Sequence, residues 1–184
     1  EEKKSTRLLD EVRARRRRLP MVEVEKEYTF TGPEGELSLQ DLFKGRRQLY
    51  LHHFMWFEEP DAFCGGCSLE ADQNYNNYFF AELEKRDVSL VAIARAPFAR
   101  IEEEKAKKGW NFPFYSSNKS DFNYDFQATV KENRNNEYNY QNTDAIHWLD
   151  EFEGDLPAKS TFIKDTDTVY HAYSAYTRGL DQLA

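Results

Sequence analysis

The chain has 184 residues, a net charge of −8 and an apolar share of 40% that is rich in Phe and Tyr. This composition is typical of one folded domain with a substantial core, and it excludes an intrinsically disordered chain. No apolar run reaches the roughly 20 residues that a membrane span needs, and no hydrophobic leader follows the charged first residues. We therefore expect a cytoplasmic protein that does not bind a membrane.

The charge is distributed unevenly along the chain. Residues 1–20 carry eight basic and four acidic side chains, so the total of −8 leaves −12 for residues 21–184. The acidic body argues against nucleic acid as a partner, because phosphate-binding surfaces need clustered positive charge. The basic run over residues 13–18 fits a solvated helix end, with an anionic surface as the alternative partner. We expect a basic helical extension over residues 1–20 and one folded domain over residues 21–184.

Hydrophobic periodicity and turn residues predict alternating strands and helices. The first part of the chain has a helix at 5–18, a strand at 22–30 ended by a turn at 32–35, a one-turn helix at 41–43 capped by Ser38, and a strand at 48–57. A helix at 68–86, a strand at 88–94, a helix at 98–108 and short extended pieces at 112–116 follow. The last part has an irregular packed excursion rich in Asn and Tyr at 119–151 and a hairpin of 160–164 with 168–176. This order predicts an α/β fold with a mixed central sheet flanked by helices.

Both cysteines of the chain lie in one motif, Cys64-Gly65-Gly66-Cys67, between a predicted strand and a predicted helix. A helix N-terminus presents unpaired N–H groups and a partial positive charge, which favour a thiolate. Cys64 is the candidate attacking thiolate, and Cys67, one turn further along, the candidate resolving thiol. Because Glu58, Glu59, Asp61 and Glu70 are the charged neighbours, we predict a reducing dithiol that is only modestly acidified. Two inert buried cysteines are the structural alternative.

Other chemistry has weaker support. A metal site needs four ligands, but the adjacent His52 and His53 of a strand point to opposite faces, so no metal or other cofactor is predicted. Trp56 and Phe63 bracket the loop before the cysteines and are either an apolar rim for a substrate or core aromatics at a strand end.

Motifs spread over most of the chain resemble those of one family. They are Leu19-Pro20-Met21-Val22, Leu39 to Phe43, His53-Phe54-Met55, Cys67-Ser68-Leu69-Glu70-Ala71-Asp72, Val91 to Pro97, Gly109 to Pro113, Ser120 to Phe126 and Tyr176 to Gly179. Together they resemble the DUF899 family of thioredoxin-like proteins, described as dithiol–disulfide oxidoreductases. The resemblance implies a thioredoxin-like fold of the peroxiredoxin-like variety, with Cys64 and Cys67 at the redox position.

The resemblance also implies a proline beside the cysteines, just before the terminal hairpin. Pro157 is the candidate for that cis-proline and for substrate contact, with Ser160 or Thr161 as alternative occupants of the position. Family members often carry a proline or a bulkier residue between the cysteines, where this chain has two glycines.

The sequence therefore predicts a thiol–disulfide oxidoreductase that acts on a disulfide-containing protein or a small thiol or disulfide. The alternatives are a thiol peroxidase, in which Cys64 becomes a sulfenic acid and Cys67 closes the disulfide, and a redox-inactive binding module that keeps the fold.

Overall fold

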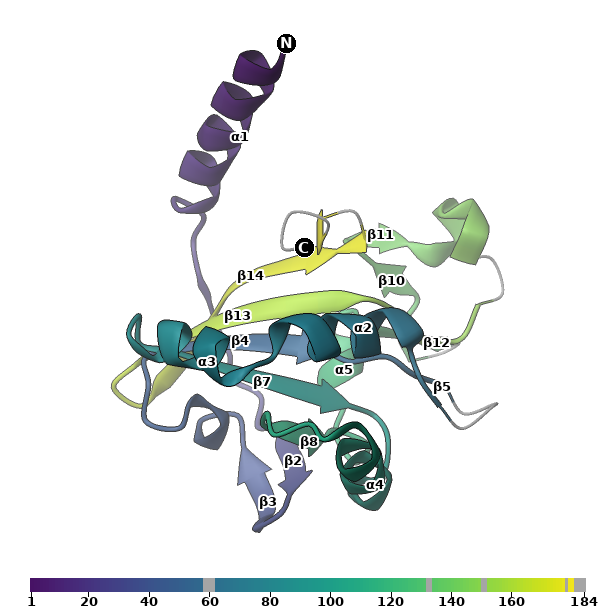
Figure 1. Ribbon diagram of the computed structural model, residues 1–184. Coiled ribbons are helices and arrows are strands. Elements are labelled where there is room, and N and C mark those ends of the chain that lie inside the picture. The colour runs from purple at the N-terminus through teal and green to yellow at the C-terminus, as the bar shows by residue number, and fades with distance from the viewer. Residues whose placement is uncertain (58–61, 132–133, 150–151, 178, 181–184) are drawn as a thin grey trace.

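The computed structural model (Figure 1) describes residues 1–57, 62–131, 134–149, 152–177 and 179–180. Its centre is an eight-stranded sheet in the order β1-β14-β13-β4-β7-β8-β2-β3. The strands of this sheet are β1 (Val22–Glu23), β2 (Thr29–Gly32), β3 (Gly35–Ser38), β4 (Gln48–His53), β7 (Val88–Ala94), β8 (Phe114–Ser116), β13 (Ala158–Asp165) and β14 (Thr168–Tyr176). β4, β7 and β8 are parallel and the other pairings are antiparallel, so the predicted mixed sheet is confirmed.

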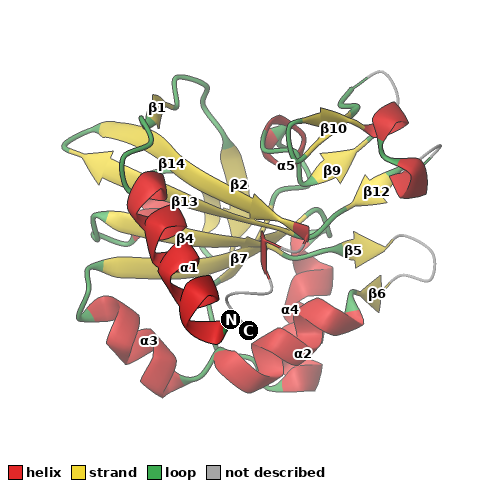
Figure 2. Ribbon diagram, turned by 90° about the horizontal axis from the view of Figure 1, so that it is seen from above, coloured by secondary structure: helices red, strands yellow, loops and turns green. Residues whose placement is uncertain are grey.

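Helices cover both faces of the sheet (Figure 2). The main ones are α1 (Glu2–Arg16), α2 (Gly65–Asn74), α3 (Asn77–Glu84), α4 (Phe98–Lys108) and α5 (Phe122–Asp125), with a 3-10 turn η1 at Asp41–Phe43. Alternate residues of β7 belong to two apolar clusters on opposite faces of the sheet. Val91 and Ile93 pack in the cluster that contains Phe122 of α5, whereas Ala92 and Ala94 pack in the cluster on the face that α2 and α4 cover. This period of two is the reason that the apolar run of β7 is buried on both faces.

Several predicted elements agree closely with the structure. β7 and α4 have the expected bounds, and Gly109 ends α4 in the left-handed region at φ 69°. Ser38 and Asp41 cap each other as expected, with the Ser38 hydroxyl 2.7 Å from the Asp41 carboxylate. The terminal hairpin of β13 and β14 is also confirmed, with a register shift at Thr161 and Phe162.

Three predicted elements are broken in the structure. The expected strand 48–57 ends at His53 as β4, and Trp56–Phe57 form β5, which belongs to a separate two-stranded sheet. The expected strand 22–30 is interrupted between β1, which is one edge strand of the sheet, and β2, which is second from the other edge. The expected helix 68–86 begins earlier, at Gly65, and is divided into α2 and α3 at Tyr75. The division follows from Asn76, whose side chain accepts a hydrogen bond from the Phe79 N–H and so starts a new helix.

The excursion over residues 119–151 is packed but largely irregular, as predicted. It contains α5, β9 (Thr129–Val130), β10 (Glu137–Tyr138), β11 (Gln141–Asn142) and the 3-10 turns η2 (Thr143–Ala145) and η3 (His147–Leu149). Buried Val130, Tyr138 and Leu149 form a third apolar cluster with Tyr176 of β14. β12 (Gly154–Asp155) pairs with β9 and leads the chain back to β13.

α1 projects from the rest of the molecule (Figure 1). It has no buried residue. None of the described helices is long and apolar enough to cross a membrane.

Candidate redox site

The two cysteines lie where a short hairpin meets α2. β5 (Trp56–Phe57) pairs with β6 (Ala62–Phe63), and the Cys64 N–H then donates to the Met55 carbonyl at 3.0 Å. Cys64 is the N-cap residue of α2, so the helix begins at Gly65. The hairpin therefore fixes Cys64 at the position where the unpaired N–H groups of a helix converge.

The two thiols have opposite electrostatic environments. Both are free; Cys64 is half-buried and Cys67 is 6% exposed. A hydrogen bond from the Cys67 thiol, aided by the backbone N–H groups of Gly66 and Cys67, lowers the pKa of Cys64 to about 6. The same hydrogen bond, together with burial, raises the pKa of Cys67 well above its usual range. At neutral pH the pair thus holds one half-buried thiolate and one buried thiol.

Cys64 is more acidic than the sequence prediction of a modestly acidified thiol. That prediction set the helix N-terminus against the acidic neighbours and did not include the Cys67 thiol, whose hydrogen bond to the Cys64 sulfur dominates in the folded chain. Three of the acidic neighbours invoked there, Glu58, Glu59 and Asp61, lie outside the described residues. The fourth, Glu70, acts on Cys67, whose pKa its charge raises further.

A buried polar network lies behind Cys67. Lys159 of β13 is 5% exposed and forms an ion pair and hydrogen bond with Glu70 of α2, one turn after Cys67. Glu70 also contacts Tyr75, whose hydroxyl lies 2.7 Å from Nδ1 of His52. Burial and the charge of Lys159 hold the pKa of His52 well below its usual range, so this imidazole is neutral. The Glu70 carboxylate of this network is still 27% exposed, and its charge acts on the resolving thiol.

A second polar group, the Asp155 carboxylate, contacts the β5–β6 hairpin. The Asp155 carboxylate, 3% exposed, accepts hydrogen bonds from the Trp56 N–H at 3.1 Å and the Thr129 hydroxyl at 2.6 Å, and pairs with Arg95 at 3.4 Å. Burial raises the pKa of this carboxyl even though Thr129 and Arg95 oppose the shift. Asp155 therefore connects the segment before β13 to β5, the first strand of the hairpin that precedes the cysteines.

The three residues predicted to contact substrate lie around this hairpin. Trp56 and Phe63 are direct cross-strand partners, and the Phe63 ring packs edge to face on Phe54 at 5.5 Å. Pro157 immediately precedes β13, two residues after Asp155, and its carbonyl accepts the Tyr138 hydroxyl at 2.8 Å. The structure thus brings Trp56 and Phe63 together next to Cys64, and it places Pro157 in the segment that Asp155 joins to Trp56. Their contact with a substrate stays a prediction.

Two hollows flank the hairpin. One, of about 380 Å³, is lined by Phe63, Gly65 and Leu69 on one wall and by Arg100, Lys107 and Lys108 of α4 among others on the opposite wall. The other, of about 290 Å³, lies between Trp56, Phe57, Arg95 and Phe152. Both hollows combine apolar side chains with basic and acidic ones, and the first of them includes Phe63 and Gly65, which adjoin Cys64 in the sequence.

The motif glycines leave the first turn of α2 open. A Cβ atom added at Gly65 meets nothing within 4 Å, and one added at Gly66 meets only the Cys64 sulfur, at 3.7 Å. The absence of side chains here is therefore not a packing requirement.

The two adjacent histidines lie on opposite faces of the sheet, as predicted. His52 contacts Tyr75, while His53 bonds to the Ser160 hydroxyl at 2.9 Å and stacks on Phe122 at 5.7 Å. Among the residues that the structure describes, no three His, Cys, Asp or Glu side chains are grouped so as to hold a metal ion.

Sequence reasoning named Glu70 only as an acidic neighbour of the cysteines, and it did not single out Lys159 or Asp155. Glu70 had a signal, because a carboxylate three residues after Cys67 shares its helix face. Lys159 and Asp155 are about 90 residues away in the chain and come to the site only through β13 and β12.

Comparison with known proteins identifies the family and the fold. The family model DUF899, described as a bacterial protein of unknown function, matches residues 1–184. Among solved structures, the peroxidoxin BcpB of Mycobacterium tuberculosis is similar at a TM-score of 0.58 and 14% identity, over 89% of this chain and 90% of that one. PrxQ of Xylella fastidiosa is similar at 0.54 and 11%, over 85% and 84%. Peroxiredoxin Q of Xanthomonas campestris is similar at 0.54 and 12%, over 83% and 80%. No curated protein matched the chain.

Proposed function

The chain belongs to the DUF899 family and has a thioredoxin-like fold of the peroxiredoxin type, and from that premise we propose that it is a dithiol–disulfide oxidoreductase. One observation carries the proposal: Cys64 caps α2 with a pKa of about 6, and its hydrogen-bond partner is a buried thiol three residues further along. A nucleophilic thiolate and a protonated resolving thiol are the two components that thiol–disulfide exchange requires.

The reaction proceeds in two steps. The Cys64 thiolate attacks one sulfur of a substrate disulfide; a bond forms between Cys64 and that sulfur, the substrate S–S bond breaks, and the first substrate thiolate leaves and takes a proton from water. Cys67 then loses its proton and attacks the Cys64 sulfur, which releases the second substrate thiol. The substrate disulfide is reduced by two electrons, the protein ends as a Cys64–Cys67 disulfide, and an external thiol reductant restores the dithiol.

The second step needs a proton acceptor, because burial keeps Cys67 protonated. Glu70 is suited to this role because it lies one helical turn from Cys67 and interacts with it electrostatically. Its exposed fraction of 27% lets the proton pass on to water, and Lys159 holds the carboxylate in place. Glu70 thus acts as a positioned base for resolution rather than for the first attack.

The two hollows beside the hairpin indicate the partner class. Each offers apolar rings together with basic and acidic side chains, which suits a polypeptide or small disulfide that presents apolar and polar groups next to its sulfur atoms. Trp56, Phe63 and Pro157 are the proposed contacts, and the cytoplasm is the proposed location.

Thiol titration tests the proposal directly. We expect alkylation of the reduced protein by iodoacetamide to follow a titration with a midpoint near pH 6, and to be lost in Cys64→Ser. Equilibration against a series of glutathione redox buffers should reveal a two-electron couple. An unreactive Cys64 without a reversible couple would instead indicate a redox-inactive binding module.

Trapping identifies the substrate and tests the assigned roles. Cys67→Ser should retain its partner as a mixed disulfide that mass spectrometry can identify, whereas Cys64→Ser, the matched control, should trap nothing. Disulfide reductase activity that survives in Cys64→Ser contradicts the assigned nucleophile. Peroxide consumption faster than disulfide reduction would replace the proposal with a thiol peroxidase.

A further inference from the structure

Exposed apolar side chains are concentrated in residues 1–22, called the N-terminal arm below. The arm has no buried residue, although it carries six large apolar side chains: Leu8, Leu9, Val12, Leu19, Met21 and Val22. Leu8 and Val12 are four residues apart on one face of α1, with Leu9 beside them. The contact of the arm helix with the body that the structure records is the Arg16 guanidinium over the Tyr173 ring, 5.0 Å from its centroid.

Such a helix needs a surface to pack against. An isolated helix of about 15 residues is marginally stable in water, because most helical stability in proteins comes from burial of an apolar face. α1 has 15 residues and leaves its apolar face uncovered. A cluster of exposed apolar side chains rimmed by charges is typical of an interaction surface.

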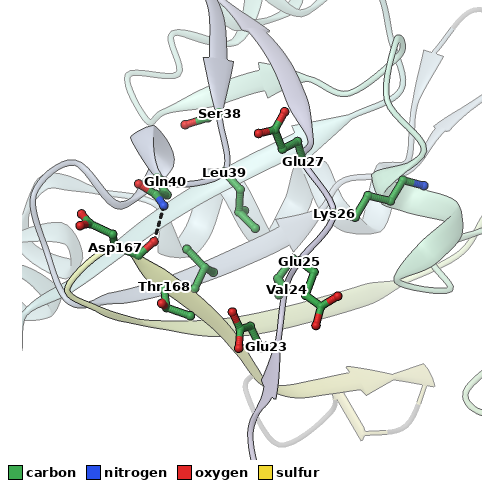
Figure 3. A pocket seen from close by; sticks show the side chains of 11 residues that line it. Glu23, Val24, Glu25, Lys26, Glu27, Ser38, Leu39, Gln40, Asp167 and Thr168 are labelled. Atoms are coloured by element: carbon green, nitrogen blue, oxygen red, sulfur yellow. Dashed lines mark hydrogen bonds between the residues drawn. The ribbon is translucent and has the colours of Figure 1, made fainter.

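A matching surface lies at the root of the arm. Figure 3 shows a cavity of about 530 Å³, called the acidic hollow, whose apolar lining comes from Val24, Leu39 and Val169. Its rim carries the exposed carboxylates of Glu23, Glu25, Glu27 and Asp167. Among the described residues, none of these four carboxylates forms an ion pair, whereas the one cation of the rim, Lys26, is engaged by Asp121 and Asp125.

We propose that two copies of the chain form a dimer by exchanging arms, so that the apolar face of α1 from each copy lies in the acidic hollow of the other. Charge supports this occupant, because residues 1–20 carry a net charge of +4 and residues 21–184 carry −12. The place of the hollow in the chain supports this occupant as well, because Glu23 of the hollow directly follows the last residue of the arm. A two-fold axis near residue 22 of both copies therefore places each arm at the hollow of the other copy, and the two equal contacts close the dimer.

A membrane is the less suitable occupant. A basic amphipathic helix also binds anionic bilayers, but here it would bring a body of charge −12 against a negative surface. In a dimer, by contrast, the acidic body of one copy attracts the basic arm of the other.

The test is the oligomeric state of the full chain, measured by sedimentation velocity. We expect the wild type to be a dimer that weakens as salt is raised, and Leu8→Glu/Leu9→Glu to raise the dimer dissociation constant by more than about tenfold. Glu25→Lys/Asp167→Lys should do the same from the other side of the interface. Tyr78→Glu is the matched control, because Tyr78 is 77% exposed on α3, and it should leave the dimer unchanged.

Mixing the two variants tests the pairing of arm and hollow. The Glu25→Lys/Asp167→Lys chain keeps an intact arm and the Leu8→Glu/Leu9→Glu chain keeps an intact hollow, so the mixture should form a heterodimer more readily than either variant dimerises alone. A monomeric wild type overturns the proposal, and so does a dimer that persists in both variants. Co-sedimentation of a monomeric wild type with phosphatidylserine vesicles would assign the arm to a membrane instead.

Discussion

His52 and His53 are neighbours in the sequence and equally buried, yet they belong to two different regions of the molecule. On the α2 face, His52 belongs to a polar chain that runs through Tyr75 to Glu70, whose charge acts on the resolving thiol. On the α5 face, His53 begins a chain through Ser160 and Ser174 that ends on His171, among the aromatic rings of the apolar cluster.

The difference lies in where each chain ends. Burial lowers the pKa of both histidines, that of His53 to about 3, so neither is charged at neutral pH. On the α2 face the polar groups lie near a thiol and include a partly exposed carboxylate, which can exchange protons with water. On the α5 face the polar groups bond to one another and end on His171, an imidazole that is only partly buried. A buried histidine therefore gains a chemical role from the groups it is connected to, and burial alone does not indicate one.

The largest expected effect on stability is on the α5 face. Phe122 is fully buried and its ring contacts Tyr28, Phe30, His53, Phe126 and Phe162. Phe122→Ala should lower the free energy of unfolding by about 3–5 kcal/mol, a large share of the roughly 5–15 kcal/mol of a typical domain. Urea unfolding measures this, and the alkylation midpoint of Cys64 should stay near pH 6. A shifted midpoint would show that the two faces are not independent.

The next effect concerns the ion pair of the α2 face. Lys159→Met leaves the Glu70 carboxylate without its buried partner, so we expect a loss of about 2–3 kcal/mol in the free energy of unfolding. Lys159→Met/Glu70→Leu removes both charges and should recover most of that loss. If the double variant is as unstable as the single one, packing of the lysine chain, rather than charge pairing, stabilises this face.

The role of Glu70 has a kinetic signature. Glu70→Gln/Lys159→Gln keeps a hydrogen-bonded pair without charges, so stability should change by only about 1 kcal/mol. Loss of the proton acceptor should slow release of substrate from the mixed disulfide at pH 7 by about tenfold or more. Stopped-flow quench experiments measure this rate. A purely electrostatic role predicts the opposite sign, because the Glu70 charge raises the pKa of Cys67 and its removal makes that thiol easier to ionise.

A further expected effect is the pH dependence that Cys64 adds to stability. Its pKa is about 6 in the folded chain and about 8.5 for an ordinary thiol, so between these values the unfolded state binds more protons. The stability of the dithiol form should therefore rise with pH from about 6 to about 8.5 relative to Cys64→Ser. The raised pKa of Cys67 stabilises the folded dithiol throughout this window, and its contribution is lost only at higher pH. Urea midpoints at both pH values measure the difference; parallel curves would contradict it.

The elements that the sequence predicted well are those whose cause is local. β7 is a continuous apolar strand and α4 ends at a glycine with positive φ, so both are defined by their own residues. The division of α2 from α3 also has a local cause, the Asn76 cap, but Asn is common in this chain and its capping role shows only in its hydrogen bond to Phe79.

The candidate site was predictable only in part for the same reason. The cysteine pair and its position at a helix start follow from residues 64–67 and their flanks. The acidity of Cys64 depends on the orientation of the Cys67 thiol, and the position of the proposed base, Glu70, depends on its ion pair with Lys159 of β13. Contacts of this kind depend on sheet register, which a single sequence does not specify.

The open glycines between the cysteines have a consequence for how this protein can change. Neither Gly65 nor Gly66 is held by a close neighbour, and each costs the first turn of α2 about 1 kcal/mol of helix stability relative to alanine. The chain can therefore accept new side chains at both positions without rebuilding its core. Its reduction potential and its choice of partner are thus open to adjustment by single substitutions, for evolution and for protein engineers.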